Sequence, residues 1–216
     1  MDVDRLFGCL VLGAMGCLGV LGISRGVMLS ARGVRIFTID RERTIREALA
    51  DLAFLLCFVF WVYETLAFAL PQDFQLVPDT ARVLVIDAMA KVPGTLAMAA
   101  GIAVYGLALR AFGSSWRPGI DRERPGPPVT SGIFSRSRNP IYLSLMLLTA
   151  GVLLVVGQLV LLVLGMIFAV YFHFLIRREE RFPMQHSGDA YRGYTQRVGR
   201  WWTRGAGRGD PDGTGE

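Results

Sequence analysis

Long blocks of apolar residues constrain the fold of this chain more than any other feature of its sequence. Five blocks are predicted to be membrane-spanning helices: residues 6–23, 48–70, 83–109, 140–156 and 159–176. An α-helix of about 18 or more apolar residues is long enough to cross the hydrocarbon core of a bilayer. Hydrophobic residues make up 52% of the chain, and its mean hydropathy is +0.42. The sequence therefore predicts an all-α integral membrane protein of about five transmembrane helices.

The placement of arginine predicts how these helices are oriented. Of the 23 basic residues, six lie between Arg25 and Arg46, six between Arg110 and Arg138, and eight after Ile176. Cytoplasmic loops of membrane proteins carry an excess of Lys and Arg. We therefore expect the N-terminus outside and the C-terminus in the cytoplasm. The acidic start is unlike the basic start of a secretory signal, so the first block is expected to stay in the protein.

Several polar or helix-breaking residues lie inside the apolar blocks. Glu64 marks a site if it is buried in the membrane, because such carboxylates are costly, but it is near enough to the end of its block to reach interfacial water. Asp87 and Lys91 are four residues apart and can pair on one helix face. Pro93-Gly94 is expected to kink the third helix or to begin its spanning part.

The polar strip before the fourth block has the features of an anion-binding helix start. Pro140 is favourable in a first helical turn, and Asn139 can cap the helix. The amides behind them form a partly positive end, and the guanidinium of Arg138 can grip a carboxylate or phosphate with two parallel hydrogen bonds. The alternative is an ordinary helix start at which Arg138 contacts lipid headgroups.

A second polar stretch follows the fifth block. Together with the polar strip before the fourth block, it forms an ordered series of motifs. The order is Ser131-Gly132, Ser137-Arg138-Asn139-Pro140-x-Tyr142, an apolar hairpin, Glu179-Glu180, Gly188-x-x-Tyr191-x-x-Tyr194 and Arg200-Trp201. Over residues 129–202 this order resembles the isoprenylcysteine carboxyl methyltransferase family. Phospholipid N-methyltransferases and small-thiol methyltransferases are relatives of that family. The Arg-Asn-Pro form is common among its bacterial-looking members, so a bacterial inner membrane is the expected location.

The resemblance implies an integral membrane enzyme that moves a methyl group from S-adenosylmethionine (SAM) to a lipophilic acceptor. Arg138 would pair with the SAM carboxylate, and of Glu179 and Glu180 one would meet the SAM ammonium while the other pairs with an arginine such as Arg200. The implied cofactor-binding residues are Arg138, Asn139, Pro140, Tyr142, Glu179, Glu180, Tyr191, Tyr194 and Arg200. The implied catalytic residues are Arg138, Glu180 and Tyr142. The expected partners are the bilayer and a lipid or small-molecule acceptor, with no metal and no nucleic acid.

Each of these residues also has a structural interpretation. Glu179-Glu180 after two arginines is usually a solvated face, and Tyr191 and Tyr194 are usually interfacial packing residues. His173 is either a base for a thiol or amine acceptor or a hydrogen-bonded structural residue. Trp201-Trp202 is expected to anchor the chain at the membrane interface.

The chain departs from the family pattern at a few positions. Pro183 stands where relatives commonly have Leu, and it is expected to break the helix after Glu180. Pro183 therefore keeps open a non-catalytic membrane protein with this fold. A second alternative to the methyltransferase is an NADPH-dependent reductase of the steroid 5α-reductase type, whose C-terminal membrane region is distantly similar. We expect an N-terminal membrane region over residues 1–128, a methyltransferase core over 129–204 and a disordered tail over 205–216.

Overall fold

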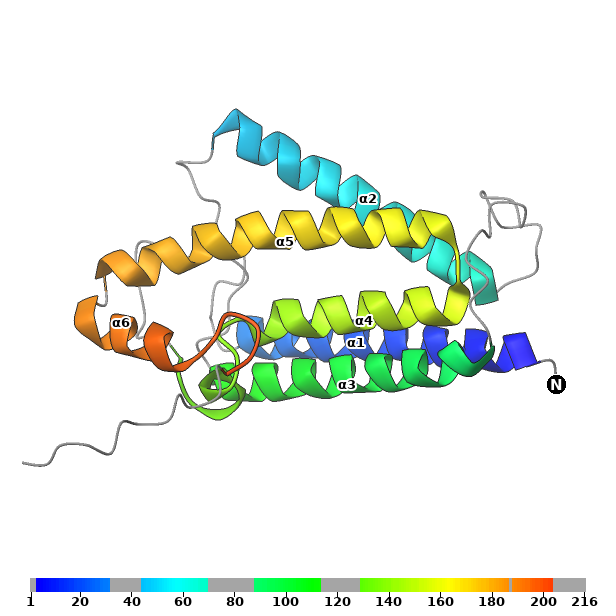
Figure 1. The fold of residues 1–216 in the computed structure, drawn as a ribbon, viewed down its shortest axis with the longest axis horizontal. Coiled ribbons are helices and arrows are strands. Elements are labelled where there is room, and N and C mark those ends of the chain that lie inside the picture. The colour runs from blue at the N-terminus through cyan, green and yellow to red at the C-terminus, as the bar shows by residue number, and fades with distance from the viewer. Residues whose placement is uncertain (1–2, 32–43, 70–87, 114–128, 187, 204–216) are drawn as a thin grey trace, which may run out of the picture.

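The computed structural model describes residues 3–31, 44–69, 88–113, 129–186 and 188–203, and every regular element in these ranges is a helix. The elements are α1 (Val3–Ala31), α2 (Ile45–Ala69), α3 (Ala88–Phe112), the short 3₁₀ helix η4 (Gly132–Ser135), α4 (Pro140–Val156), α5 (Leu159–His186) and α6 (Gly188–Arg197). The five long helices run back and forth along one axis, and α6 folds back beneath the end of α5 (Figure 1). The prediction of an all-α architecture is confirmed.

Four of the helices are long and apolar enough to cross a membrane: α1, α2, α3 and α5. The fourth predicted span is α4, an apolar helix of 17 residues that is shorter than the other four. The largest extensions beyond the apolar blocks are those of α1, which continues to Ala31, and of α5, which continues to His186. All five predicted helices are therefore present, and four of them meet the length expected of a span.

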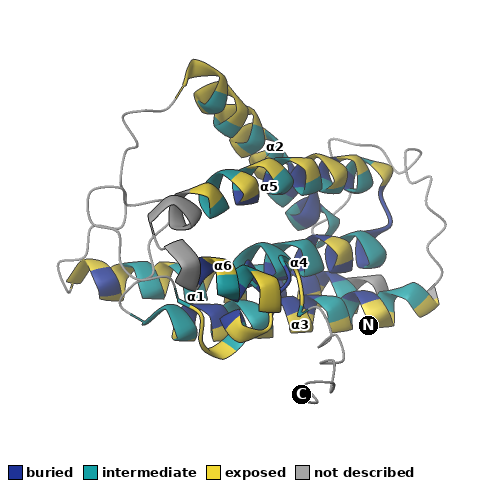
Figure 2. Ribbon diagram, turned by 60° about the vertical axis from the view of Figure 1, so that its left-hand side comes forward, coloured by how far each residue is buried: buried dark blue, intermediate teal, exposed yellow. Residues whose placement is uncertain are grey.

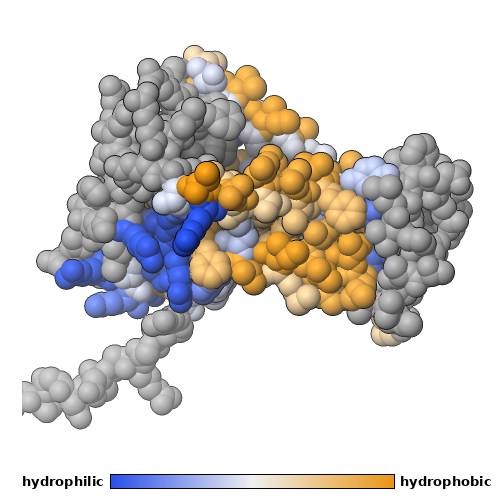
Figure 3. Space-filling view, turned by 90° about the horizontal axis from the view of Figure 1, so that it is seen from above, coloured by the Kyte–Doolittle hydropathy of each residue, from blue (hydrophilic) through white to orange (hydrophobic). Residues whose placement is uncertain are grey.

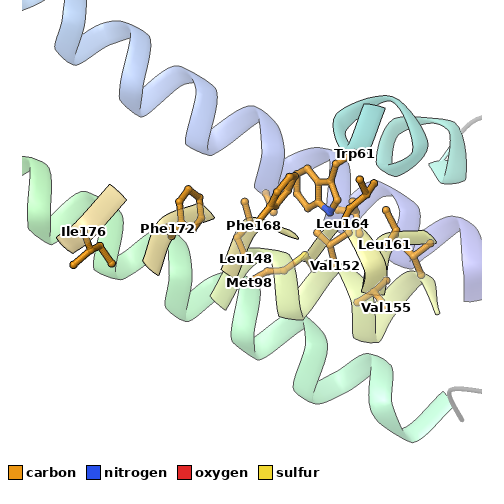
Figure 4. Packing of buried hydrophobic residues seen from close by; sticks show 13 residues of the cluster. Trp61, Met98, Leu148, Val152, Val155, Leu161, Leu164, Phe168, Phe172 and Ile176 are labelled. Atoms are coloured by element: carbon orange, nitrogen blue, oxygen red, sulfur yellow. The ribbon is translucent and has the colours of Figure 1, made fainter. Parts of the chain in front are cut away.

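The apolar core lies between α4, α5 and the helices on either side of them. Figure 4 shows Met98 of α3, Leu148 of α4 and Phe168 of α5 meeting in this interior, with Trp61 of α2 nearby. The outward faces are apolar as well, and Val20 and Ile23 of α1 are 66% and 70% exposed. Figure 2 shows such exposed residues along α1 and α2. An apolar surface outside an apolar core is what a helix bundle in lipid requires.

Helices α3 and α4 form the most extensive helix pair in the structure because glycines let their backbones approach. A Cβ atom at Gly151 of α4 would lie 2.6 Å from the carbonyl oxygen of Gly94 in α3, and one at Gly101 would lie 2.8 Å from the carbonyl oxygen of Ser144. Small residues at such contacts are a general device for packing helices in membranes. Pro93 lies inside α3, in the part of the helix that follows Ala88.

Gly151→Ala is expected to lower the melting temperature of the purified protein. The added methyl group would overlap the α3 backbone, and overpacking of this kind typically costs about 1–3 kcal/mol. Gly106→Ala is the matched control, because nothing lies within 4 Å of a Cβ atom there and alanine favours the helix by roughly 0.8–1 kcal/mol. A Gly151→Ala protein as stable as the Gly106→Ala protein would contradict the close α3–α4 packing.

The turn between α4 and α5 forms the tight antiparallel hairpin that the sequence predicted. Gly157 takes a left-handed conformation with φ of 71°, and its N–H donates to the carbonyl of Leu153 at 2.8 Å. Glycine adopts this conformation without the steric cost that other residues meet. The turn directs α5 back to the end of the bundle where α4 begins.

The prediction that Pro183 breaks the helix after Glu180 is wrong. The helix does not break after Glu180 but continues through Pro183 to His186. Proline lacks one helical hydrogen-bond donor, yet its fixed φ angle is compatible with a helix, so the chain can continue at the cost of that bond. Both glutamates of the predicted motif therefore lie within a regular helix.

Glu64 is fully buried, with 0% of its surface exposed. Its carboxylate therefore does not reach interfacial water, which was one of the two interpretations of the sequence. Two other predictions fall outside the described residues: the pairing of Asp87 with Lys91, and the disordered tail over 205–216.

Candidate functional site

The predicted site residues come from elements that gather at one end of the bundle. Helix α4 begins there, α5 ends there, and η4 and α6 lie beside them (Figure 1). Hydrophilic residues concentrate at this end, whereas apolar residues cover the middle of the molecule (Figure 3). The structure thus places the Arg138 corner and the Glu179-Glu180 pair, 41 residues apart in sequence, next to each other.

Backbone contacts tie the segment after α6 to the corner before α4. The N–H of Arg138 donates to the carbonyl of Gly199 at 3.2 Å. The Ser137 hydroxyl donates to the carbonyl of Arg200 at 3.4 Å, and Ser137 itself is fully buried. The segment that carries Arg200 is therefore held against the start of α4.

Asn139 occupies the cap position of α4 but does not cap it with its side chain. Its side-chain nitrogen instead donates to Glu180 Oε1 at 2.9 Å and to the carbonyl of Arg200 at 3.4 Å. The prediction of a capping role is wrong because a charged acceptor competes successfully for this amide. Asn139 consequently links three segments of the chain: the start of α4, the end of α5 and the stretch after α6.

Glu180 is the centre of a cluster with two arginines. Arg200 Nη2 lies 2.8 Å from Glu180 Oε2, and Arg200 Nε donates to the same oxygen at 3.2 Å. Arg138 Nη1 lies 3.5 Å from Glu180 Oε1. The side chains of Arg138 and Glu180 are only 13% and 12% exposed. The hydrogen bond with Glu180 raises the pKa of Arg200, so this guanidinium keeps its charge.

One donor of the cluster has no hydrogen-bond partner among the described residues. Arg138 Nε is buried and makes no hydrogen bond to the described residues. An unsatisfied buried donor costs about 1–3 kcal/mol, and more when it is charged. The arrangement therefore fits a further acceptor beside Arg138, such as the carboxylate of a ligand.

Glu179 points away from the cluster, as successive residues of a helix must. Its carboxylate lies near the Tyr142 hydroxyl of α4. The Tyr142 ring packs against Phe172 of α5, with ring centroids 5.3 Å apart. This second pair thus lies between the charged cluster and the apolar core.

Tyr191 and Tyr194 form a small core with Val198 that attaches α6 to the corner. The Tyr194 hydroxyl donates to the carbonyl of Phe134 in η4 at 2.7 Å. Burial raises the pKa of Tyr194 to about 12 and also raises the pKa of Tyr191, so both keep their protons at neutral pH. The packing interpretation accounts for these contacts, and a role in ligand binding stays a prediction.

Two further interpretations of the sequence concern residues outside the charged cluster, the Trp201-Trp202 pair and His173. Trp201 and Trp202 are 37% and 53% exposed, which fits the interfacial anchor. The His173 ring packs against Phe174, the next residue along, and no contact described for it reaches the cluster.

A neighbouring set of contacts between α2 and α5 was missed by the sequence reasoning. The Tyr171 hydroxyl donates to Asp51 at 2.6 Å, its ring stacks on Phe54, and Arg178 pairs with Glu47 at 3.6 Å. The signal lies in the spacing of Glu47, Asp51 and Phe54, which share one face of a helix. Thr44 and Glu47 also form a capping box at the start of α2 that was readable from the sequence.

The architecture so far defines a class: an apolar helical bundle with a buried charged cluster at one end. The model of the phospholipid methyltransferase family matches residues 90–188, which cover nearly all of α3, all of α4 and all of α5. No curated protein matches the chain. The match supports a membrane methyltransferase of the wider group in which the sequence had placed the chain, but it does not single out the isoprenylcysteine branch. It includes Arg138 and Glu180 and ends before Tyr191, Tyr194 and Arg200.

Proposed function

We propose that this protein is an integral membrane methyltransferase that moves a methyl group from SAM to a lipophilic acceptor. The observation that carries the proposal is the buried cluster of Arg138, Glu180 and Arg200 at the end of a bundle matched by a methyltransferase family. The region of the match supports the reaction class. The charged cluster supports SAM as the methyl donor.

The amino-acid part of SAM is a zwitterion, and the Arg138–Glu180 pair complements it. The Arg138–Glu180 contact, at 3.5 Å, is long for an ion pair, whereas Arg200 holds the other oxygen of Glu180 at 2.8 Å. A carboxylate bound to Arg138 would use Nε, which has no partner in the part of the chain that the structure describes, and an ammonium would meet Glu180 Oε1. Arg200 would keep Glu180 in place throughout. In this proposal Glu180 takes both roles that the sequence divided between two glutamates. One of its oxygens pairs with Arg200, and the other meets the SAM ammonium.

The sulfonium of SAM supplies an activated methyl group, so the protein mainly aligns the two reactants and excludes water. The segment over residues 188–200 covers the cluster through the contacts of Ser137, Arg138 and Tyr194. We expect it to act as a lid over SAM, with Tyr191 and Tyr194 beside the adenine. The apolar outer faces of the helices would let a lipophilic acceptor approach from the bilayer.

Inside-out and right-side-out vesicles test donor and orientation together. Because the arginine distribution predicts that the cluster faces the cytoplasm, radiolabelled SAM should be used only when it is added to inside-out vesicles containing the protein. Vesicles from cells lacking the protein are the control. Transfer of label in right-side-out vesicles alone would overturn the orientation.

Binding measurements on the purified protein separate the remaining alternatives. SAM and S-adenosylhomocysteine should bind, and NADPH should not. Binding of NADPH without SAM would favour the reductase, and binding of neither would favour a non-catalytic protein. The helical continuity of α5 through Pro183 removes the reason for which the sequence kept a non-catalytic protein as an alternative.

A further inference from the structure

A second set of buried polar side chains lies at the end of the bundle opposite the charged cluster. It consists of Trp61 and Thr65 on α2 and of Gln158 in the turn between α4 and α5. Trp61, Thr65 and Gln158 are only 2%, 0% and 1% exposed. Figure 1 shows the end of α2 and this turn at the same end of the molecule, away from α6. The set is therefore separate from the proposed SAM site.

The packing of α2 on α5 brings the members of this set together. The two helices are antiparallel (Figure 1), and Trp61 packs against Phe168 of α5 with ring centroids 6.0 Å apart. Thr65 is four residues, about one turn, further along α2 on the same face. It therefore faces the first turns of α5, where Leu161 lies at this end of the core (Figure 4). Gln158 directly precedes these turns, so its side chain and that of Thr65 meet in the same part of the interior.

The turn that carries Gln158 holds its side chain inside the bundle. The backbone carbonyl of Gln158 accepts hydrogen bonds from the N–H groups of Leu161 and Leu162 at 3.1 and 3.3 Å, which fixes the start of α5. The side-chain amide takes no part in these bonds. A polar residue in a turn between two spans can normally reach water, because such segments run over the surface. An amide that is buried there instead indicates a polar group for it to bind.

The polar atoms of this set have no hydrogen-bond partner among the described residues. They are Trp61 Nε1, Thr65 Oγ1 and both side-chain atoms Oε1 and Nε2 of Gln158. Glu64, fully buried on the same side of α2, adds a carboxylate to the surroundings. Buried polar groups are costly to leave unsatisfied, most of all in a membrane, where bulk water cannot reach them. Four such atoms in one part of the bundle fit a ligand that binds between them.

The hydrogen-bonding character of these atoms defines the ligand. The indole N–H only donates, the carbonyl oxygen of the Gln158 side chain only accepts, and the Thr65 hydroxyl does both. The ligand must therefore accept one hydrogen bond and donate another through one small group. An ester or ether oxygen cannot donate, and an ammonium cannot accept. An O–H group can do both.

We propose that Trp61, Thr65 and Gln158 form a binding site for an uncharged O–H group, supplied by internal water or by a lipid alcohol. The chemistry of the site is the same for both sources. Buried waters of proteins typically make about three hydrogen bonds to polar groups that lack other partners, and the three side chains offer that number. The site lies away from the charged cluster, and its existence does not depend on methyl transfer.

The test uses the full chain in nanodiscs of phosphatidylcholine, a lipid without O–H groups, with the indole nitrogens of the four tryptophans labelled with ¹⁵N. Trp61→Phe identifies the Trp61 signal by removing it. If the site holds water, the Trp61 indole proton should show a nuclear Overhauser contact with water protons. If it holds a lipid alcohol, the contact should appear only when dodecanol is added, and dodecyl methyl ether, which cannot donate, should have no effect. Thr65→Val and Gln158→Met should abolish the contact.

The melting temperature gives an independent test, because the sign of its change depends on whether the site is filled. Thr65→Val replaces a hydroxyl by a methyl group of similar size. The variant should melt several degrees lower if the hydroxyl binds a ligand, whereas removing an unsatisfied hydroxyl would raise the melting temperature. Thr95→Val is the matched control, because Thr95 Oγ1 donates to the carbonyl of Lys91 in its own helix at 2.9 Å. This control should leave the Trp61 signal unchanged.

Two results would each overturn the site. One is a Trp61 indole proton without contact to water in phosphatidylcholine and without contact to dodecanol when it is added. The other is a Thr65→Val protein at least as stable as the unmodified protein. A response to dodecyl methyl ether equal to that to dodecanol would show that the ligand need not donate, and it would overturn the assignment to an O–H group.

Discussion

Glu180→Gln is expected to weaken SAM binding at least about a hundredfold and to release the segment over residues 188–203 from the bundle. The substitution keeps the size of the side chain and removes its charge. Two guanidinium groups, of Arg138 and Arg200, would then lack their counter-ion. Removing one partner of a buried ion pair typically costs about 3–5 kcal/mol. Isothermal titration with SAM measures the first effect, and hydrogen exchange over residues 188–203 measures the second.

Glu47→Gln is the matched control for this variant. Glu47 also pairs with an arginine of α5, but its side chain is 38% exposed. Exposed ion pairs contribute about 0–1 kcal/mol. The Glu47→Gln protein should therefore bind SAM normally and keep the hydrogen-exchange rates of residues 188–203. Hydrogen exchange of the unmodified protein should slow over residues 188–203 when SAM is added. Normal SAM affinity and unchanged exchange in the Glu180→Gln protein would exclude the lid.

The parts of the fold that follow from hydropathy could be predicted from the sequence. Apolar blocks located all five long helices, and the Gly157-Gln158 spacing predicted the hairpin between α4 and α5. Hydropathy is a sum over many residues, so single exceptions do not disturb it. Hydropathy does not report where a helix ends, because polar residues can continue it, as they do at the ends of α1 and α5.

Which side chains of the site pair with each other could not be predicted in the same way. The order of motifs identified Arg138, Glu180 and Arg200, but not which glutamate meets which arginine. Asn139 had two possible partners, the free N–H groups of α4 and the carboxylate of Glu180. The second is 41 residues away and becomes a competitor only when α5 returns to the corner. The same limit applies to the pairing of α3 with α4, which depends on Gly94 facing Gly151.

Arg138→Ala is expected to abolish measurable SAM binding while the protein still inserts and folds. In the proposed complex Arg138 would make two charge-assisted hydrogen bonds to the SAM carboxylate, each contributing about 1.5–3 kcal/mol. Their loss would raise the dissociation constant by about two orders of magnitude or more. The fold should tolerate the change because Arg200 continues to neutralise Glu180 at 2.8 Å, and because the Arg138 backbone bond to Gly199 does not depend on the side chain.

Arg136→Ala provides the control for charge alone, since Arg136 is exposed and lies two residues earlier in the same corner. It removes the same positive charge from the same end of the bundle without touching Glu180. Titration with SAM should therefore give unchanged affinity for Arg136→Ala and no measurable binding for Arg138→Ala, with equal melting temperatures for the two variants in the absence of SAM. If both variants lost affinity to the same extent, a diffuse basic surface would be attracting SAM. If Arg138→Ala retained full affinity, the SAM carboxylate would have to bind elsewhere, and the Arg138–Glu180 pair would be a structural clasp between α4 and α5.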